Sequence, residues 1–325
     1  MSNKSLVVKN IDICSRNKTM GLLLFVIVYP LVWLLSSLPM RLLYVLSDFL
    51  YILIYYVFGY RKKVIYENIE LSFPDLSESE RKQLVKKFYH HFLDLMVESI
   101  KAFTISKKEI QKRYVYKNPE LVNKYAAEGK SIAMVGAHLA NWEWSIAMAL
   151  SVDINCFGAY TKLGNKYFDK VMLKTRQRFG FIGYPTTNTI KNMQKNFADG
   201  VQGLYLLLSD QSPQLPKTFF WHTFLGVKVP IHTGAESLAK RFDMVVINYH
   251  ITKVKRGYFE VEFELITDRP QEFEDYKITE NYLKITERNI NLQPECYLWS
   301  HRRFKHRNSY KEWEENFAAK NKTKK

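Results

Sequence analysis

Cysteine is scarce in this sequence. Cys14, Cys156 and Cys296 are the only three cysteines among 325 residues, and no two of them form a CxxC pair. An odd number of widely spaced cysteines argues against both a disulfide framework and a cysteine-ligated zinc site. The chain is therefore expected to reside in a reducing compartment, with its thiols as ordinary core or surface residues.

Two catalytic motifs are also missing. No serine or cysteine lies in a GxSxG turn, so a covalent Ser-His-Asp mechanism lacks its nucleophile. The zinc-binding pattern HExxH does not occur, and a single His–Glu pair is a poor metal site. We therefore expect neither a metal nor a cofactor.

Acidic residues are too few to balance the basic ones. The chain has 48 Lys and Arg against 32 Asp and Glu, which gives a net charge of +16. Such an excess indicates an anionic partner, namely nucleic acid, an anionic membrane surface or an acidic protein. With 47% hydrophobic and 15% aromatic residues, general disorder is excluded.

Charge is absent from residues 20–40. This run of 21 residues is long enough, at about 1.5 Å per residue, to cross a hydrocarbon core about 30 Å thick. A second apolar run at residues 42–60 contains Asp48 as its single charged residue, and the basic triplet RKK follows it. The first run is too long for a signal peptide and has no clear cleavage site.

These runs predict a membrane anchor and leave its form open. Pro30 would kink a straight span, whereas the aromatic residues and the second run suit a helix pair lying in the interface. The basic cluster after the apolar region places the main domain on the cytoplasmic side. We expect an anchor over residues 1–60, one catalytic domain over 61–310 and a basic tail over 311–325.

The catalytic domain shows strand patterns that alternate with helical ones. Strands are expected at residues 131–135, 203–208, 244–249 and 258–265. Ser77 and Glu80 form a capping box before a helix whose apolar face repeats every four residues, at Leu84, Phe88, Phe92 and Met96. This alternation predicts an α/β fold, a mixed sheet flanked by helices.

The stretch GAHLANWE follows the apolar run SIAMV and contains His138 and Glu143. Ligands of open α/β sheets bind at the carboxyl ends of strands. A histidine accepts protons near neutral pH, and a carboxylate on its other ring nitrogen fixes its tautomer. The pair is therefore a candidate base for activating a substrate hydroxyl. The alternative is a core histidine beside a helix-capping glutamate.

Three other segments contain candidate substrate-binding residues. An apolar strand ends at LLLSDQSP, the stretch KTRQRFG holds two arginines that suit phosphate or an oxyanion, and CYLWSHRRFKHR interleaves basic and aromatic side chains. Such interleaving suits nucleic acid or, beside a membrane anchor, lipid phosphates or an acidic carrier protein. The candidates are Asp210, Gln211, Arg176, Arg178, Arg302 and Arg303.

GAHLANWE resembles the His-x₄-acid signature of glycerolipid acyltransferases, in the form typical of bacterial lipid A late acyltransferases. The blocks RKKVIYENIELSFPDLSESER, SDQ, HTGAESLAKR and YLWSHRRFKHR resemble other blocks of that family, in the same order. The likeness covers nearly the whole chain from about residue 20 to residue 308.

The resemblance implies transfer of an acyl chain from acyl carrier protein to a hydroxyl of a lipid A precursor, at the cytoplasmic face of the bacterial inner membrane. His138 would be the general base and Glu143 its orienting partner. Arg176 and Arg178 would steady the oxyanion or a phosphate, and Asp210 would help shape the pocket. The implied fold is an α/β sheet flanked by helices.

One block departs from the family pattern. The family usually shows Tyr-Arg-Pro where this sequence has GAYTKLGN, with Thr161 and Lys162. Recognition of the acceptor head group is therefore open, and a lyso-phospholipid or an aminolipid is an alternative acceptor. A catalytically silent protein that binds anionic lipid is another alternative. A nucleic-acid binder would leave the uncharged run unexplained.

Overall fold

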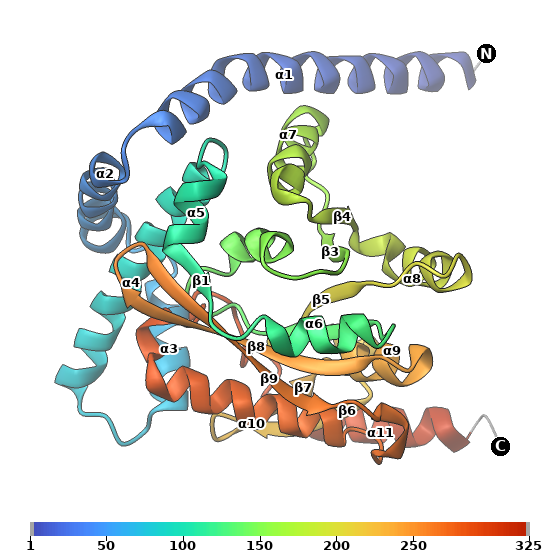
Figure 1. Cartoon of the computed structure of the whole chain (residues 1–325). Helices are drawn as coiled ribbons and strands as arrows, with labels where there is room; N and C mark the ends of the chain where they lie inside the picture. The colour runs from blue at the N-terminus through green and yellow to red at the C-terminus, as the bar shows by residue number, and fades with distance from the viewer. Residues whose placement is uncertain (1–2, 323–325) are drawn as a thin grey trace.

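The computed structural model describes the backbone of residues 3–322 and the side chains of residues 20–316. A seven-stranded sheet in the order β1-β9-β8-β2-β5-β3-β4 forms its centre (Figure 1). All neighbouring strands are parallel except β8 and β9, which are antiparallel. The strands are β1 (Tyr114–Tyr116), β2 (Ile132–Gly136), β3 (Cys156–Tyr160), β4 (Ile182–Pro185), β5 (Leu204–Leu208), β8 (Val245–Lys255) and β9 (Tyr258–Thr267).

The predicted α/β class is confirmed, and so are the four expected strands, which correspond to β2, β5, β8 and β9. β2 is buried at every position because it lies between two parallel neighbours and has helices packed on it. The sequence patterns missed β1, β3 and β4. They also missed the separate antiparallel hairpin of β6 (Phe220–Phe224) and β7 (Val227–Ile231), because strands this short show little periodicity.

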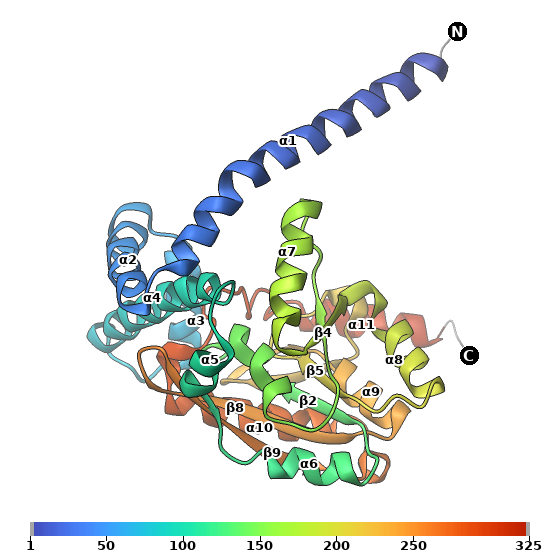
Figure 2. The same ribbon diagram turned by 45° about the horizontal axis from the view of Figure 1, so that its top comes forward.

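Helices cover the sheet, and five of the described α-helices precede its first strand in the chain. Helices α6, α9 and α10 pack against β2, while α7 and α8 pack against the edge strand β4 (Figures 1 and 2). The α-helices are α1 (Asn3–Ser37), α2 (Met40–Ile52), α3 (Lys62–Ser72), α4 (Glu78–Lys101), α5 (Lys107–Arg113), α6 (Glu120–Ala127), α7 (Lys166–Arg176), α8 (Thr189–Ala198), α9 (Gly234–Phe242), α10 (Lys277–Leu292) and α11 (Tyr310–Lys322).

Helix α4 has the predicted capping box, with Ser77 accepting from Glu80 N and the Glu80 side chain accepting in return. Of the expected apolar face, Leu84 and Phe88 are buried, Phe92 is half-buried, and Met96 is 37% exposed and so does not belong to the core. His91 is buried in the same helix at 3% exposure, and burial lowers its pKa to about 3. A histidine held neutral in this way has a structural role.

The two apolar N-terminal runs form α1 and the continuous helix from Met40 to Phe58, whose last six residues are a π-helix. By length and composition, Met20–Ser37 and Met40–Phe58 are both able to cross a membrane. Only 6% of the first segment is buried. Helix α1 continues through Pro30.

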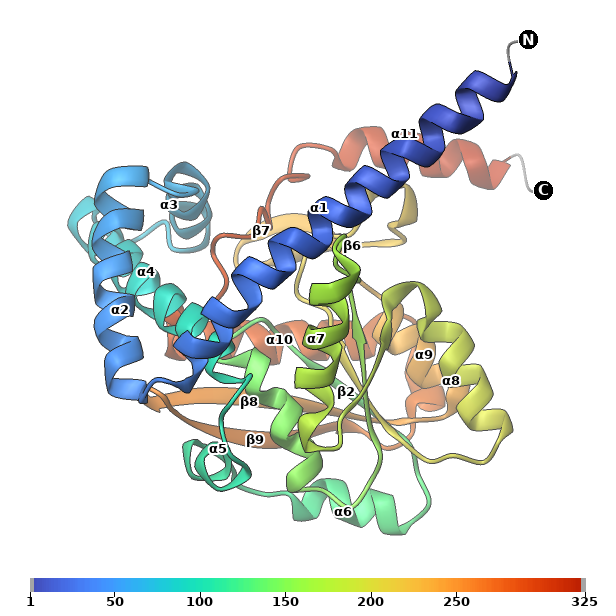
Figure 3. The same cartoon turned by 90° about the horizontal axis from the view of Figure 1, so that it is seen from above.

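Helix α1 contacts the rest of the molecule at both ends of its apolar part. Asn165, the N-cap of α7, donates a 2.8 Å hydrogen bond to Gly21 O, and Lys101 at the end of α4 donates one of 2.8 Å to Ser36 O. Phe25 packs edge-on against Phe168 of α7. The helix therefore runs along one side of the molecule and passes over α7 (Figure 3).

Candidate active site

The ends of two neighbouring parallel strands bring His138 and Asp210 together. β2 and β5 pair in register up to Gly136 and Leu208, and each candidate residue follows its strand by two positions. Nδ1 of His138 lies 2.7 Å from Oδ1 of Asp210. The Asp210 side chain is 1% exposed and that of His138 is 19% exposed. The imidazole is thus held from the protein side and open on the other.

The electrostatics of this pair favour a charged imidazole. Burial lowers the pKa of His138, but the charge and hydrogen bond of Asp210, together with the charge of Glu143, outweigh burial and raise the pKa above its ordinary value. Burial raises the pKa of Asp210, and the His138 charge and hydrogen bonds more than reverse this effect. Asp210 therefore remains a carboxylate that stabilises the imidazolium formed when His138 accepts a proton.

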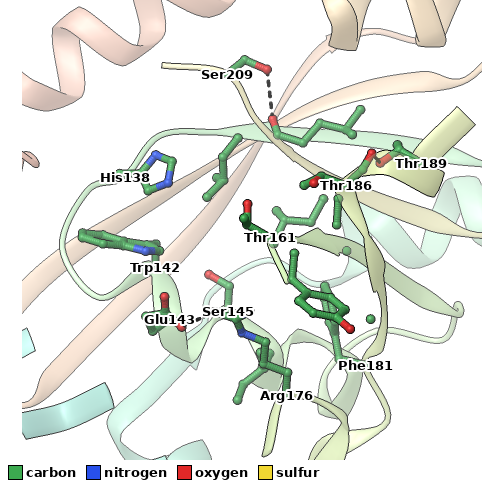
Figure 4. Close-up of a pocket in the computed structure, with 18 of the residues that line it drawn as sticks. His138, Trp142, Glu143, Ser145, Thr161, Arg176, Phe181, Thr186, Thr189 and Ser209 are labelled. Carbon is green, nitrogen blue, oxygen red and sulfur yellow. Dashed lines mark hydrogen bonds and ion pairs between the residues drawn. The ribbon is translucent and has the colours of Figure 1, made fainter. Parts of the chain in front are cut away.

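Glu143 does not orient His138, which corrects the expectation from the sequence. Its Oε2 lies 3.4 Å from Nη2 of Arg176. A 3₁₀-helix begins at Trp142 and extends to Leu150, which directs Glu143 toward α7. Since Asp210 reaches Nδ1 of His138 from the adjacent strand, that nitrogen is already occupied. Both partners of the Glu143–Arg176 pair line the same cavity as His138 (Figure 4).

An unusual turn presents His138. Ala140 has φ +50°, a left-handed conformation that is uncommon for a residue with a side chain. The turn is held by the segment after α10, because Ala140 N donates to Cys296 O at 2.9 Å and Leu298 N donates to His138 O at 3.2 Å. The backbone around His138 is therefore fixed by a segment more than 150 residues later in the chain.

His138 opens onto a cavity of about 550 Å³ between the 3₁₀-helix Trp142–Leu150, α7, α9 and the ends of the central strands (Figure 4). Its polar side includes His138, Glu143 and Arg176. The remaining wall combines apolar side chains with the polar Thr161, Asp169, Thr186, Thr189, Ser209 and His232, and its apolar part includes Ile146, Met172, Phe181, Leu206, Leu238 and Ala235. A cavity of this size with a substantial apolar lining suits a ligand that has an apolar part.

Three residues that the sequence did not single out complete the surroundings of His138. The ring of Trp142 stands edge-on to the imidazole with centroids 5.2 Å apart. His232 and Ser145 line the cavity. Burial and the Arg303 charge lower the pKa of His232. Trp142 lies within the motif GAHLANWE, and His232 begins the block HTGAESLAKR just before α9, but the sequence did not indicate that either one lies beside His138.

The other predicted residues divide between the site and the scaffold. Gln211 belongs to the site, with Nε2 at 3.3 Å from Nε2 of His138. Arg178 does not, since its guanidinium donates to Ala102 O at 2.7 Å and to Ile105 O at 3.0 Å, just after the end of α4. Arg303 is 1% exposed and donates to Pro230 O at 3.2 Å, whereas Arg302 is exposed.

The substrate-binding role expected for these two arginines stays a prediction, and in the structure both guanidiniums bond to backbone carbonyls. Arg178 bonds to the carbonyls of Ala102 and Ile105, just after the end of α4. Arg303 is enclosed beneath the site, where it stacks 5.0 Å above the ring of Phe224. Among residues 20–316, no three His, Cys, Asp or Glu side chains come together in a way that could hold a metal ion.

Comparison with known proteins gives one consistent result. The profile of the bacterial lipid A biosynthesis acyltransferases matches residues 15–306. The chain is 25% identical over 279 residues to a lipid A biosynthesis lauroyltransferase of Escherichia coli, covering 85% of this chain and 89% of that protein. It is 25% identical to a lipid A biosynthesis acyltransferase of Haemophilus influenzae, covering 71% of this chain and 72% of that one. It is 23% identical to a lipid A biosynthesis myristoyltransferase of Escherichia coli, covering 71% of each chain.

The profile match extends from the apolar part of α1 to the segment that supports the His138 turn. It therefore includes both strand ends of the candidate site, the helix that presents Arg176 and most of the N-terminal apolar region. The chain belongs to the bacterial lipid A biosynthesis acyltransferase family.

Proposed function

We propose that the protein transfers a fatty acyl chain from acyl carrier protein to a hydroxyl of a lipid A precursor, with His138 as the general base. The observation that carries this proposal is the hydrogen bond between His138 Nδ1 and the buried Asp210 at the mouth of a cavity with a substantial apolar lining. The bond keeps the ring proton on Nδ1, so Nε2, which faces the Gln211 amide at 3.3 Å, accepts the proton once the acceptor hydroxyl replaces that amide contact.

The reaction needs no protein nucleophile. His138 removes the hydroxyl proton while the acceptor oxygen attacks the thioester carbonyl, which forms a C–O bond. The C–S bond then breaks, and the proton held by His138 passes to the leaving thiolate. Arg176, on the cavity wall, is placed to stabilise the oxyanion, and Glu143 holds its guanidinium. Asp210 takes the orienting role that the sequence suggested for Glu143.

The apolar part of the cavity suits the acyl chain. The side chains of Ile146, Leu206 and Leu238 lie on its walls. An alkyl chain buried against them leaves water, which contributes about 0.8 kcal/mol for each methylene group. A lyso-phospholipid or aminolipid acceptor is the second candidate, because Thr161 lines the cavity in the block that departs from the family pattern.

The N-terminal helices support work at a membrane surface. Gly21 and Ser36 are about 22 Å apart along α1, and both bond to the rest of the molecule. A helix that crossed the bilayer away from the molecule would have such contacts at one end alone. We therefore favour α1 as an interfacial anchor, with the catalytic residues on the cytoplasmic face of the inner membrane.

The test is acyl transfer followed by mass spectrometry. Detergent-solubilised protein is mixed with acyl-loaded carrier protein and a tetra-acylated lipid A precursor, alongside the variants His138→Ala and Glu143→Ala. The expected result is a mass gain of one acyl chain, with a loss of about 10²–10⁴-fold in rate for His138→Ala. A gain with a lyso-phospholipid alone would overturn the acceptor assignment. No transfer to any acceptor, with lipid binding intact, would indicate a silent lipid-binding protein.

A further inference from the structure

A buried carboxylate lies behind the turn that presents His138. Oε2 of Glu98, on α4, accepts a 2.7 Å hydrogen bond from Nδ2 of Asn141, and Oε1 accepts one of 2.8 Å from the hydroxyl of Tyr44 on α2. Nε1 of Trp144 donates to the backbone carbonyl of Glu98 at 3.0 Å. Glu98, Asn141 and Trp144 are each 0% exposed. Glu98 thus connects an N-terminal helix to both ends of the motif ANWEW.

The oxygen and the nitrogen of the Asn141 side-chain amide make hydrogen bonds to different groups. Its Oδ1 accepts from Trp144 N at 3.1 Å and so begins the 3₁₀-helix that presents Trp142 and Glu143. Its Nδ2 points to Glu98. A carboxylate only accepts hydrogen bonds, so Glu98 allows one orientation of this amide and excludes the flipped one. The amide follows directly on Ala140, the residue with positive φ.

We propose that Glu98 is a positioning residue for acyl transfer, which fixes the Asn141 amide and through it the turn that holds His138, Trp142 and Glu143. The proposal rests on the proposed function. It gives a reason for keeping a fully buried carboxyl group in a helix that does not itself line the cavity. An apolar residue of similar size would cost less to bury but would leave Nδ2 of Asn141 without an acceptor.

The surroundings of Glu98 make its protonation state relevant near neutral pH. Burial raises the pKa of Glu98 to about 7, the charge of Asp94 acts in the same direction, and hydrogen bonds from Tyr44 and Asn141 and the Lys253 charge oppose it. The titratable and charged groups that face Glu98 are Tyr44 from α2, Asp94 from α4, Lys253 from β8 and Cys296 from the segment after α10.

The experiment exchanges the donor and the acceptor. Asn141→Asp places two carboxyl groups against each other, which form a hydrogen bond only when they share a proton. Relative to the wild type at the same pH, we expect kcat of Asn141→Asp to fall by about 10²-fold at pH 8, as for a small misplacement of the reacting groups. We expect a partial recovery at pH 6, with KM nearly unchanged at both values.

The double variant Glu98→Gln/Asn141→Asp restores a donor–acceptor pair without a shared proton. Gln accepts from Tyr44 and donates to the new aspartate, which still accepts from Trp144 N. Its kcat is expected within a few-fold of the wild type at pH 8. The matched control is Asn123→Asp, because Asn123 donates to a carboxylate of Asp153 at 2.9 Å on the surface, and neither residue lines the cavity. This control is expected to leave kcat unchanged.

Three outcomes overturn the positioning role. The first is a wild-type kcat in Asn141→Asp at pH 8, and the second is an equal loss of kcat in the single and double variants at both pH values. The third is a lower thermal midpoint for Asn141→Asp with an unchanged kcat, which indicates scaffolding alone. A wild-type protein without transfer overturns the proposed function itself, and the positioning role falls with it.

Discussion

His138 is hydrogen-bonded through Nδ1 to Asp210, 72 residues later in the sequence, and not to Glu143, which lies five residues away in the same motif. The two strands that precede them are parallel neighbours, so their carboxyl ends meet at one edge of the sheet. The nearby acid instead holds Arg176. The roles of the two acids in the site therefore differ, and substitution separates them.

The pH profile of transfer tests the His138–Asp210 pair. Because the pKa of His138 is raised, activity should increase with pH and reach half its maximum above about 6.5, the ordinary value for histidine. Asp210→Asn removes the charge responsible, so the profile should move to lower pH while the maximal kcat falls by about 10²-fold or more. An Asp210→Asn profile at the wild-type position would contradict the pairing.

The His138–Asp210 pair should also affect how the stability of the protein depends on pH. The raised pKa of His138 stabilises the folded state fully below about pH 6.5, and this stabilisation is lost as pH rises through the folded-state pKa. The lowered pKa of Asp210 also stabilises the folded state, and this stabilisation is lost as pH falls below about 4. The difference in thermal midpoint between wild type and Asp210→Asn should therefore be largest between these values. Calorimetry at pH 5 and pH 9 measures it, and an equal difference at both would contradict the pair.

Glu143→Gln should be milder than Asp210→Asn. The glutamine loses the ion pair with Arg176 but leaves the hydrogen bond of His138 to Asp210 intact. Since the Glu143–Arg176 pair is about 30% exposed, we expect it to contribute no more than about 1 kcal/mol. Steady-state kinetics should show a modest fall in kcat and a shift of the pH profile to lower pH that is smaller than for Asp210→Asn, because the Glu143 charge contributes less than Asp210 to the raised pKa of His138. A larger loss than for Asp210→Asn would restore Glu143 as the main partner.

Arg176 and Arg178 form a natural pair of variants, because they are close in sequence but contact different groups. Arg178→Gln should lower the unfolding free energy by about 1 kcal/mol, through lost hydrogen bonds to Ala102 O and Ile105 O, and should leave KM unchanged. Arg176→Gln should lower kcat and leave stability nearly unchanged. Denaturant titration and kinetics of both variants check this, and a raised KM for Arg178→Gln would return that residue to the substrate site.

Gly136→Ala should destabilise the protein. A Cβ at this position, the end of β2, would overlap the ring of Tyr249 on β8. Because both residues are buried, the overlap cannot be relieved by a side chain moving into solvent. We expect the free energy of unfolding to fall by about 1–3 kcal/mol. Chemical denaturation measures it. Gly136→Ala combined with Tyr249→Leu should recover part of the loss, and a fully stable single variant would contradict this packing.

Helix α7 should contribute to membrane binding. Lys166, Lys170 and Lys174 follow one another at four-residue spacing, all are exposed, and no salt bridge of theirs occurs among the described side chains. The helix contacts the apolar part of α1. Changing the three to Gln should weaken binding to anionic vesicles by about 1 kcal/mol per lysine.

Vesicle sedimentation at low and high salt checks this prediction. The variant should bind neutral vesicles as the wild type does and should lose most of its salt dependence. Lys284→Gln, an exposed lysine on α10, serves as the control and should bind normally. Unchanged binding of the triple variant to anionic vesicles would exclude α7 as the contact.

The sequence by itself determined the elements whose signals are local. The alternation of apolar runs with helical periods predicted the α/β sheet, the Ser77–Glu80 capping box predicted the start of α4, and the uncharged run predicted an apolar N-terminal helix. His138 and Gln211, which follow closely on the strands β2 and β5, lie together in the structure, and their roles stay predictions. The domain boundaries at residues 60 and 310 stay predictions.

Only the tertiary structure decided which residues meet. Arg178 and Arg303 are residues of the type that binds phosphate, but their guanidiniums donate to backbone carbonyls just after the end of α4 and in strand β7. Glu98 gave no signal, because its partners Tyr44 and Asn141 lie more than 40 residues away on either side. Hydrogen bonding depends on distance in space, and the order of parallel strands that brings Asp210 to His138 is not encoded in any short stretch of the chain.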